Sequence, residues 1–589
     1  MKSLLSIINQ QMKEAFEAKG YDSENVCASI SNRPDLCEYQ CNSCMALAKR
    51  LGAKPIDIAT RIVEELSGSD MFINVNAVMP GFINFDIAPS FLAEYIAQMD
   101  GDDRCGLAID ENPKTIIVDY GGANAAKPLH VGHLRSAVIG ESVKRLGALF
   151  GHHMIGDVHL GDWGLQMGLI IEELRMRQPS LAYFDENYKG DYPSEAPFTL
   201  GELEEIYPAA SKRASEDGEF KDRAHDATLK LQSGYAPYVA IWRHIIDVSV
   251  TDLKKNYGAL GVEFELWKGE SDSEPYIPEL IELLTKKGIA YESQGALVVD
   301  VTEETDSKEL PPCIIRKSDG ASLYATSDLA TIIEREKLYH PDEYIYITDK
   351  RQNMHFVQVF RVAKKAGLVP EDRRLVHIGF GTVNGKNGSA LKTRDGGVMR
   401  LETLMQEIDD AVYKKITANK EIGENEAREI SRVVGLAALK YGDLSNQASK
   451  DYIFDIDRFS EFEGNTGPYI LYTIVRLNSI LNKWKEQGGA NTSPADITSP
   501  DSKVLKELYL KIASFSDSML SAYSELAIHR ICQYVYSICD IVNAFYHDVK
   551  ILTCEDKVKQ SNYIEIIRLT IKILVISTNV LGLEIPSRM

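Results

Sequence analysis

Residues 118–135 read Val118-Asp119-Tyr120-Gly121-Gly122-Ala123-Asn124-Ala125-Ala126-Lys127-Pro128-Leu129-His130-Val131-Gly132-His133-Leu134-Arg135. The β-branched run over residues 115–119 predicts a buried strand, and the apolar spacing over residues 131–150 predicts a helix, with a Gly/Pro-rich turn between them. A helix that follows a parallel strand presents unpaired N–H groups and the positive end of its dipole, which favour phosphate oxygens. This stretch therefore predicts a nucleotide site.

The two histidines of the stretch are candidate donors to phosphate. His130 and His133 lie at the start of the predicted helix, and Gly132 between them has no Cβ, so a base or ribose could approach the backbone closely. An H-x-G-H pattern alone is weak, because many helices carry two histidines by chance. Zinc is the other possibility, since His152, His153 and His159 are close in sequence. However, the H-x-x-H pair has no third ligand at a usual spacing, so we expect no metal centre.

Length, composition and charge limit the class of protein. A chain of 589 residues with 44% hydrophobic residues predicts several soluble globular domains. No run approaches the ~18 apolar residues of a membrane span, and the first ten residues lack a secretion signal, so we expect a cytoplasmic protein that does not bind membranes. The formal charge of -21 argues against a nonspecific nucleic-acid coat, although local basic patches could still hold a shaped RNA such as tRNA.

The order of predicted elements suggests a multidomain α/β protein with three parts. Residues 1–110 contain helices at 4–19 and 57–66 and a strand at 82–86, which predict a small α+β domain. From 111 to 400 strands alternate with helices, which predicts a parallel sheet with an insertion at about 180–290. The strand candidates are 115–119, 154–158, 296–301, 344–348 and 374–378.

Residues 401–589 predict an all-α domain, because strand patterns disappear after Leu401. The segment 486–501 is rich in Gly, Asn, Ser, Thr and Pro and predicts an exposed loop. The helix candidates are 424–441, 467–485, 502–520, 525–549 and 563–581.

Several motifs together resemble the class I arginyl-tRNA synthetases, and the resemblance covers essentially the whole chain. The signature around His130 and His133 is followed by Leu160-Gly161-Asp162-Trp163-Gly164-x-Gln166. The further matches are Tyr324-Ala325-Thr326-Ser327-Asp328, Arg351-Gln352-x-x-His355, Lys392-Thr393-Arg394-Asp395-Gly396-Gly397 and, more weakly, Asn465-Thr466-Gly467-Pro468-Tyr469. One departure is Gly121-Gly122-Ala123, where many relatives have Ser-Ser-Pro, which puts a hydroxyl contact from this turn in doubt.

The resemblance implies an arginine–tRNA ligase that uses ATP and Mg²⁺. Such an enzyme needs no protein nucleophile, so its groups orient the reactants and stabilise developing charge. Lys392 has no second lysine as in the usual K-M-S-K-S loop, and Lys127 is expected to compensate. The expected catalytic residues are His130, His133, Lys127 and Lys392, and the expected ATP contacts are Ala123, Asn124, Lys127, Pro128, Leu129, His130, Val131, Gly132, His133, Lys392, Thr393 and Arg394.

Arginine recognition is assigned by the same resemblance. A guanidinium is permanently cationic and is best bound by carboxylates, so Asp328 with Tyr324 is expected at that end of the substrate. The α-amino and α-carboxyl groups are expected at Asp119, Gly122, Asn124 and Gln352. Asp119 replaces the glutamate of some relatives. Asp328 could also be a helix N-cap, because an apolar-periodic segment follows it.

The resemblance also assigns roles to the three parts. Residues 1–110 would contact the tRNA elbow, residues 111–400 would form a Rossmann-type catalytic domain, and residues 401–589 would bind the anticodon of tRNA(Arg). We expect a monomer.

Two other functions compete with this interpretation. Cys37-x-x-x-Cys41-x-x-Cys44 resembles the iron–sulfur triplet of radical S-adenosylmethionine enzymes. However, residues 35–51 predict a helix with all three thiols on one face, where cysteine is a common core residue. An inactive synthetase-like tRNA-binding module is the second alternative. Such a module would be expected to lose the histidines or the Lys392 loop, and both are present.

Overall fold

The computed structural model describes all residues except 319, 321–322, 387, 390, 392–398 and 419–421. The chain divides into two compact units. Unit 1 comprises residues 1–110, 461–579 and 584–589, and unit 2 comprises residues 111–460 and 580–583. Within the described residues, none of the helices has the length and apolar character that crossing a membrane requires.

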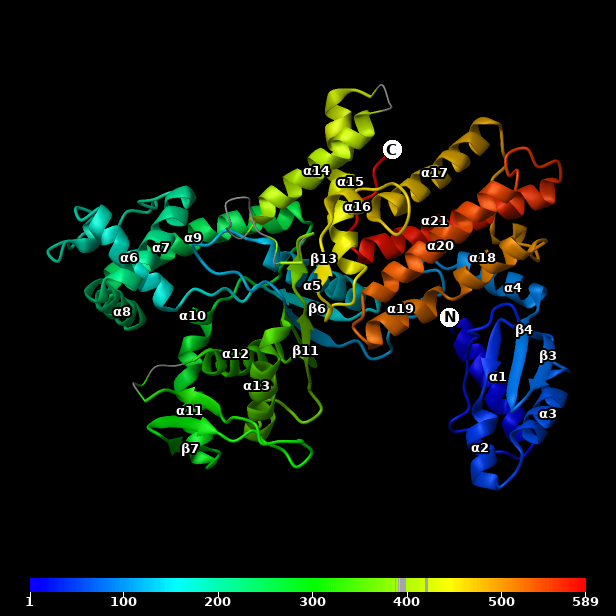
Figure 1. Ribbon diagram of the computed structural model, residues 1–589, viewed down its shortest axis with the longest axis horizontal. Coiled ribbons are helices and arrows are strands. Elements are labelled where there is room, and N and C mark those ends of the chain that lie inside the picture. Colours follow the sequence, from blue (N-terminus) through cyan, green and yellow to red (C-terminus); the bar gives the residue numbers. More distant parts are fainter. Residues whose placement is uncertain (319, 321–322, 387, 390, 392–398, 419–421) are drawn as a thin grey trace. The chain divides into compact units, whose positions relative to one another are not determined.

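A four-stranded parallel sheet forms the centre of unit 2 (Figure 1). Its order is β11 (Arg374–Phe380), β10 (Glu343–Asp349), β5 (Thr115–Asp119) and β6 (His153–Asp157). The chain leaves β5 toward β6 on one side and leaves β10 toward β11 on the other. The carboxyl ends of β5 and β10 therefore border a topological switch point, where ligands bind in open α/β sheets.

Helix α5 (Val131–Leu149) follows β5 and packs closely against the sheet. A Cβ at Gly140 would lie 2.2 Å from Cγ of Tyr120, the residue after β5, so the helix needs glycine at this contact. In the other half of the sheet, the short 3-10 helix η3 (Lys350–Gln352) and then α13 (Asn353–Ala366) connect β10 to β11. The strand–turn–helix unit predicted at residues 115–150 is therefore confirmed.

The prediction that residues 296–301 form a strand of the parallel sheet was wrong. Residues 296–301 contain β8 (Ala296–Val299), which pairs antiparallel with both β7 (Ala290–Ser293) and β9 (Cys313–Arg316) in a separate three-stranded sheet. The buried side chains of β8 pack in a core with α11 (Ile277–Lys286), α12 (Tyr324–Tyr339) and α13. Strand patterning reports burial but not the direction of pairing, so the sequence could not distinguish the two sheets.

The region between β6 and β7 is mostly helical. Phe220 and Ala224 of α8 and Ala210 of α7 share a small core with Leu169 of α6. Besides α11, the helices of this region are α6 (Leu165–Arg177), α7 (Leu200–Glu216), α8 (Gly218–Gln232), α9 (Ala236–Ala259) and α10 (Glu270–Ser273), with 3-10 turns η1 (Ala182–Phe184) and η2 (Glu274–Tyr276).

Among the described residues, three helices beyond residue 400 lie in unit 2. These are α15 (Glu424–Leu444) and two that were not among the helix candidates, α14 (Leu401–Thr417) and α16 (Ile456–Phe459). Strands also do not disappear after Leu401, because β13 (Tyr452–Ile453) pairs in parallel with β12 (Val383–Asn384). Strands of two residues are too short to leave a sequence pattern. The three-part functional division stays a prediction, while residues 401–460 belong to the same unit as the central sheet.

Unit 1 contains an antiparallel sheet in the order β1-β2-β4-β3 and a set of carboxyl-terminal helices. The strands are β1 (Ala28–Ile30), β2 (Tyr39–Cys41), β3 (Phe72–Val78) and β4 (Phe82–Ile87). The amino-terminal helices are α1 (Leu4–Ala18), α2 (Ser43–Leu51), α3 (Pro55–Leu66) and α4 (Pro89–Asp100). The carboxyl-terminal helices are α17 (Gly467–Glu486), α18 (Lys503–Ala513), α19 (Phe515–Ser524), α20 (His529–Asp548) and α21 (Lys557–Val580), with the 3-10 turn η4 (Pro494–Asp496) between α17 and α18.

Two helix predictions in unit 1 were wrong. The predicted helix over residues 35–51 is a turn, strand β2 and then α2, so the three cysteines do not share a helical face. Their spacing fits a helix, but pairing of β2 with β4 overrides that local preference. The predicted helix over residues 502–520 is divided at Ser514, where α18 ends and α19 begins.

Candidate active site

A pocket of about 390 Å³ lies at the carboxyl edge of the parallel sheet. It is bordered by the turn after β5, the start of α5 and the ends of β10 and β11, at the topological switch point of the sheet. Its lining residues are Gly121, Gly122, His130, Val131, Gly132, His133, Arg135, Ser136, Ile347, Thr348, Asp349, Arg351, Gln352, Phe380, Gly381, Thr382, Val383 and Leu391.

The side chains of His130 and His133 lie against each other at the start of α5, and each ring is held by a backbone N–H group. His130 is the N-cap, and its Nδ1 accepts a hydrogen bond from the backbone N–H of Gly132 at 3.0 Å. The Nδ1 atom of His133 accepts from the backbone N–H of His130 at 3.1 Å, and the ring centroids are 4.0 Å apart. Because each Nδ1 acts as an acceptor, the ring proton of each neutral imidazole is assigned to Nε2. Both Nε2 atoms are therefore donors.

Burial keeps both imidazoles neutral at pH 7. It lowers the pKa of His130, with the nearby Lys127 charge adding to the effect. It lowers the pKa of His133 to about 3, with His130 as the next cause. The pair thus carries two uncharged N–H donors at the pocket, and His133 already has the Gly122 backbone as a hydrogen-bond partner. A Cβ at Gly132 would lie 2.7 Å from Cε1 of His130, so glycine is required there by the N-cap ring itself.

Four of the predicted ATP contacts line this pocket, namely His130, Val131, Gly132 and His133. The Nζ atom of Lys127 lies instead over the ring of Tyr207 in α7, 4.6 Å from its centroid. Ala123, Asn124, Pro128 and Leu129 belong to the turn before α5, where Ala123 and Leu129 are buried. Lys392, Thr393 and Arg394 lie outside the described residues.

The turn before α5 is held by the Leu160–Gln166 segment, which the sequence motif had singled out. Asn124 bridges to Gly161, whose N–H donates to the Ala123 carbonyl at 2.9 Å. A Cβ at Gly161 would lie 2.6 Å from Oδ1 of Asn124. Glycine in this motif therefore allows the two segments to approach each other.

The residues predicted to contact arginine divide into those that line the pocket and those that lie outside its lining. Gly122 and Gln352 line the pocket, whereas Asp119, Asn124, Tyr324 and Asp328 do not. Tyr324 is the first residue of α12 and is 75% exposed. The Asp328 carboxylate contacts Nε2 of His355 at 2.5 Å, and Nε2 of His159 lies 3.8 Å from its other oxygen. The N-cap interpretation of Asp328 was wrong, because α12 begins at Tyr324 with Leu323 as its cap.

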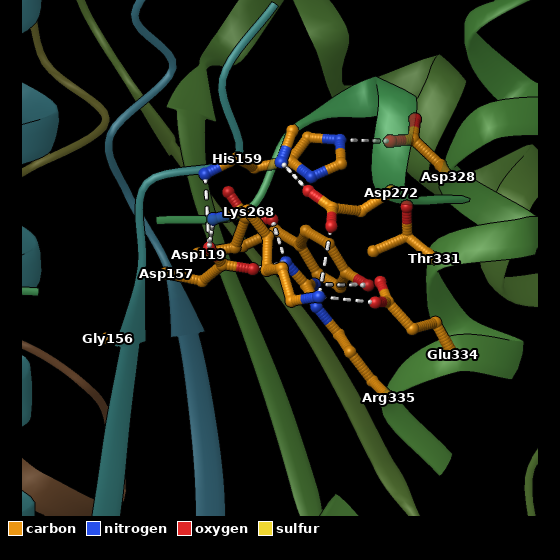
Figure 2. Close-up of polar contacts among 12 residues, drawn as sticks. Asp119, Gly156, Asp157, His159, Lys268, Asp272, Asp328, Thr331, Glu334 and Arg335 are labelled. Carbon is orange, nitrogen blue, oxygen red and sulfur yellow. Dashed lines mark hydrogen bonds and ion pairs between the residues drawn. The ribbon is translucent and has the colours of Figure 1, made fainter. Parts of the chain in front are cut away.

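Asp119 lies in a buried ion-pair network that the sequence motifs did not indicate (Figure 2). The Nη2 atom of Arg335 in α12 donates to Asp119 at 2.6 Å and to Asp157 at 2.7 Å. Burial raises the pKa of Asp119, while Arg335 and then His159 oppose that shift. At His159, burial lowers the pKa, but the negative charges of Asp119 and Asp328 outweigh it, so the pKa of His159 is raised.

The same network contains the one group of described side chains whose potential metal-ligating atoms all lie within 4.8 Å of one another: Asp119, Asp157 and His159. Arg335 already bridges the two carboxylates, so the group is an ion-pair network rather than a cation site. Asp157 and His159 adjoin the Leu160 motif, and this proximity was the available sequence signal. Nothing in the spacing around Arg335 pointed to its role.

Comparisons with known proteins agree along the whole chain. The family model described as tRNA synthetases class I (R), catalytic domain, matches residues 99–456. The models for the arginyl tRNA synthetase N terminal domain and the DALR anticodon binding domain match residues 2–87 and 470–589. Proteins named arginine–tRNA ligase from Agathobacter rectalis and Alkaliphilus oremlandii are 55% and 51% identical, with 100% of each chain covered. The chain belongs to the arginyl-tRNA synthetase family.

Solved arginyl-tRNA synthetases share its fold. The Plasmodium falciparum enzyme aligns with a TM-score of 0.82 at 23% identity, and the Thermus thermophilus enzyme with 0.80 at 20%, each over 100% of both chains. The predicted fold class is confirmed, with a parallel-sheet catalytic region and helices at the carboxyl end. The predictions of family and of ligase activity are also confirmed. Membership in the family implies that the synthetase uses ATP.

The cysteine triplet has a structural place in this synthetase. Cys37, Cys41 and Cys44 are buried at 4%, 0% and 0% exposure. Cys37 Sγ donates to the Ser31 hydroxyl at 3.3 Å, and the three sulfur atoms are not all within 4.8 Å of one another. The triplet therefore packs in the core of the amino-terminal region, as the structural interpretation expected, although not on one helix.

Proposed function

We propose that the chain activates L-arginine with ATP and transfers it to the 3′ end of tRNA(Arg). In the first step the arginine carboxylate attacks the α-phosphorus of ATP and diphosphate leaves. In the second step the terminal hydroxyl of the tRNA attacks the adenylate carbonyl and AMP leaves. The observation that carries the proposal is the His130–His133 donor pair, which faces a pocket at the sheet switch point.

The histidines would act as electrostatic donors rather than as acid–base groups. Their Nε2–H groups and the amino-terminal N–H groups of α5 would bind phosphate oxygens on which charge develops in the transition state. Lys127 and Lys392 would offset the charge of the leaving diphosphate. For Lys127 this requires its ammonium to leave the Tyr207 ring, a contact worth only about 0.5–2 kcal/mol.

Mg²⁺ would accompany ATP, bound mainly through phosphate oxygens and water. Asp349 is the carboxylate among the described pocket-lining residues, and both of its oxygens already accept hydrogen bonds from Arg351. A magnesium ion that keeps most of its waters needs only one or two carboxylates beyond the substrate. The residues present therefore fit a metal brought in with the nucleotide, not a dedicated protein site.

The substrate arginine would be bound both at its guanidinium and at its α-amino and α-carboxyl groups. Asp328 would bind the guanidinium with help from Tyr324, and Asp119, Gly122, Asn124 and Gln352 would hold the α-amino and α-carboxyl groups. The half-buried Asp328 supports this assignment, because His355 and His159 place cationic or donor groups against its carboxylate. A substrate guanidinium could replace one of them with a stronger, bidentate partner.

The remaining assignments concern location and assembly. We propose that residues 1–110 contact the tRNA elbow, that residues 111–400 form the catalytic domain, and that residues 401–589 bind the anticodon. We propose a monomer that acts in the cytoplasm, where tRNA is used. The helical region matched by the anticodon-binding model supports the placement of tRNA contacts there.

The decisive experiment measures attachment of labelled arginine to tRNA with ATP and magnesium. We expect charging of arginine, and little charging of lysine or of citrulline, the uncharged analogue of arginine. Asp328→Asn should lower kcat/KM for arginine by an amount equivalent to about 2–5 kcal/mol, because a buried cation loses its partner, while KM for ATP changes little. Equal charging of citrulline would refute the pocket assignment. Binding of tRNA without any charging would instead favour the inactive tRNA-binding module.

A further inference from the structure

Residues of three neighbouring strands meet the guanidinium of Arg335. Asp119 and Asp157 are register partners at the ends of β5 and β6, and Tyr346 of β10 is the register partner of Asp119 on the other side. Arg335 reaches all three, because its Nη1 also lies 3.3 Å from the Tyr346 hydroxyl. Two carboxylates directly opposite on adjacent strands repel each other. One buried guanidinium neutralises this repulsion and holds both side chains in place.

The carboxylates of Asp119 and Asp157 differ in whether their second oxygen, the one that Arg335 does not contact, is free to bind a ligand. The second oxygen of Asp157 faces the backbone N–H groups of His159 and Lys268 at 3.3 and 3.4 Å, and its side chain is 1% exposed. The second oxygen of Asp119 makes no hydrogen bond to any of the described residues, and its side chain is 10% exposed. Both oxygens of Asp157 are therefore held within the network, whereas one oxygen of Asp119 stays available to a ligand.

Helix α12 links this anchor to the other end of the proposed arginine site. Asp328 and Arg335 are seven residues apart, so both lie on one face of α12, separated by about 10 Å along its axis. Asp328 and Arg335 project toward the same region in Figure 2, with His159 between Asp328 and the ends of the strands. The Arg335 contacts thus set the position of α12, and with it Asp328, relative to Asp119.

We propose that Arg335 is a positioning residue that sets the separation of the Asp119 and Asp328 carboxylates and so selects the length of the amino acid that bridges them. Arg335 does not contact the substrate; it acts through Asp119 and through the placement of α12. This inference rests on the proposed binding roles of Asp119 and Asp328. Arginine is suited to the task because its planar guanidinium directs Nη2 at the two carboxylates and Nη1 at the Tyr346 hydroxyl in a fixed geometry, which lysine does not reproduce.

Arg335→Lys in the full chain tests the proposal, since it keeps the charge and loses the fixed donor geometry of the guanidinium. Charging kinetics would be measured with arginine, with homoarginine, which is one methylene longer, and with varied ATP. We expect KM for arginine to rise on the order of 10- to 100-fold, as for a misplacement near 1 Å, and KM for ATP to change less than about twofold. The preference for arginine over homoarginine should fall about tenfold, which a loss of stability alone would not produce.

Glu334→Gln is the matched control on the same helix. Glu334 is also buried and forms an ion pair with Lys268 at 3.0 Å, but it contacts neither Asp119 nor Asp328. We expect this variant to lose stability while both KM values and the homoarginine preference stay near wild type. If Glu334→Gln raised KM for arginine as much as Arg335→Lys, the effect would be general loosening of α12 and the proposal would be wrong.

Tyr346→Phe provides a milder variant that keeps the buried ring. It removes only the hydroxyl beside Nη1 of Arg335, so KM for arginine should rise about two- to fivefold with KM for ATP unchanged. An unchanged KM for arginine in both Arg335→Lys and Tyr346→Phe would overturn the inference even if Asp328→Asn abolishes charging. A wild-type enzyme that did not charge arginine would instead overturn the proposed function.

Discussion

Arg135, which lines the pocket from α5, forms a buried ion pair with Asp443 in α15, with Nε 2.9 Å from Oδ1 and side-chain exposures of 1% and 0%. The Nη1 atom of Arg135 also donates to the carbonyls of Gly381 and Lys450, each at 2.9 Å. One guanidinium thus joins α5, the segment after β11 and a helix beyond residue 400 that the strand and helix patterns had assigned to another domain.

Arg135→Met should therefore cost about 3–5 kcal/mol of unfolding free energy, because the Asp443 carboxylate is left buried without a counter-charge. The double variant Arg135→Met/Asp443→Asn should regain part of this loss, since no lone charge then stays inside. Urea unfolding of the full chain measures both. A double variant whose destabilisation equalled the sum of the single ones would argue against coupling.

His130 has separable capping and donor roles. Asparagine can keep the bond from the Gly132 N–H but lacks the Nε2 donor, whereas glutamine carries an amide N–H₂ near that donor and loses the cap. His130→Asn should lower ATP–diphosphate exchange about 10²–10³-fold with little change in thermal midpoint. His130→Gln should retain more activity and melt earlier. The reverse order would mean that His130 serves mainly as a cap.

Burial of His133 predicts a specific pH dependence of stability. Its pKa is about 3 in the folded chain, against an ordinary value of 6.5, so below pH 6.5 the unfolded chain takes up a proton that the folded chain refuses. This contribution to stability is complete above pH 6.5 and is lost as the pH falls toward 3, at up to ~1.4 kcal/mol per pH unit. His133→Gln should flatten the dependence between pH 6.5 and 4. A slope identical to wild type would contradict the assignment.

Lys127 and Lys392 should act together on the leaving group. Lys127→Ala and Lys392→Ala should each lower turnover more than they weaken arginine binding, and their effects should not add in the double variant. Tyr207→Leu is the control, because it removes the ring beneath Lys127 but keeps the charge; its effect on turnover should be severalfold smaller. Normal turnover in Lys127→Ala with an inactive Lys392→Ala would show that no compensation occurs.

The core thiols should be chemically inert. Burial raises the pKa of Cys41, and raises the pKa of Cys44 to about 12, so little thiolate forms at pH 8. Iodoacetamide should label the exposed Cys27 in the folded protein before Cys41 and Cys44, as peptide mass analysis would show. Replacing Cys37, Cys41 and Cys44 by Ser should lower stability but preserve charging. Visible absorbance from an iron–sulfur cluster after anaerobic purification would revive the other enzyme class.

Local order along the chain was readable from the sequence because neighbouring residues determine it. The strand before Tyr120, the Gly/Pro turn and the His130 helix start depend on side-chain periodicity, backbone freedom and a cap formed within a few residues. The same holds for the long helices α15, α17, α20 and α21. The paired histidines could be proposed as phosphate donors on these grounds alone, and their motif spacing indicated the family.

The tertiary structure decided everything that depends on which distant segments meet. Arg335 contacts Asp119 and Asp157 across 216 and 178 residues, because sheet order brings β6, β5 and α12 together. The antiparallel pairing of β8, the strand at Cys41 and the burial of Arg135 against Asp443 also follow from such long-range contacts. Periodicity records that a side chain is buried, whereas the identity of its partner is set only when the sheet assembles.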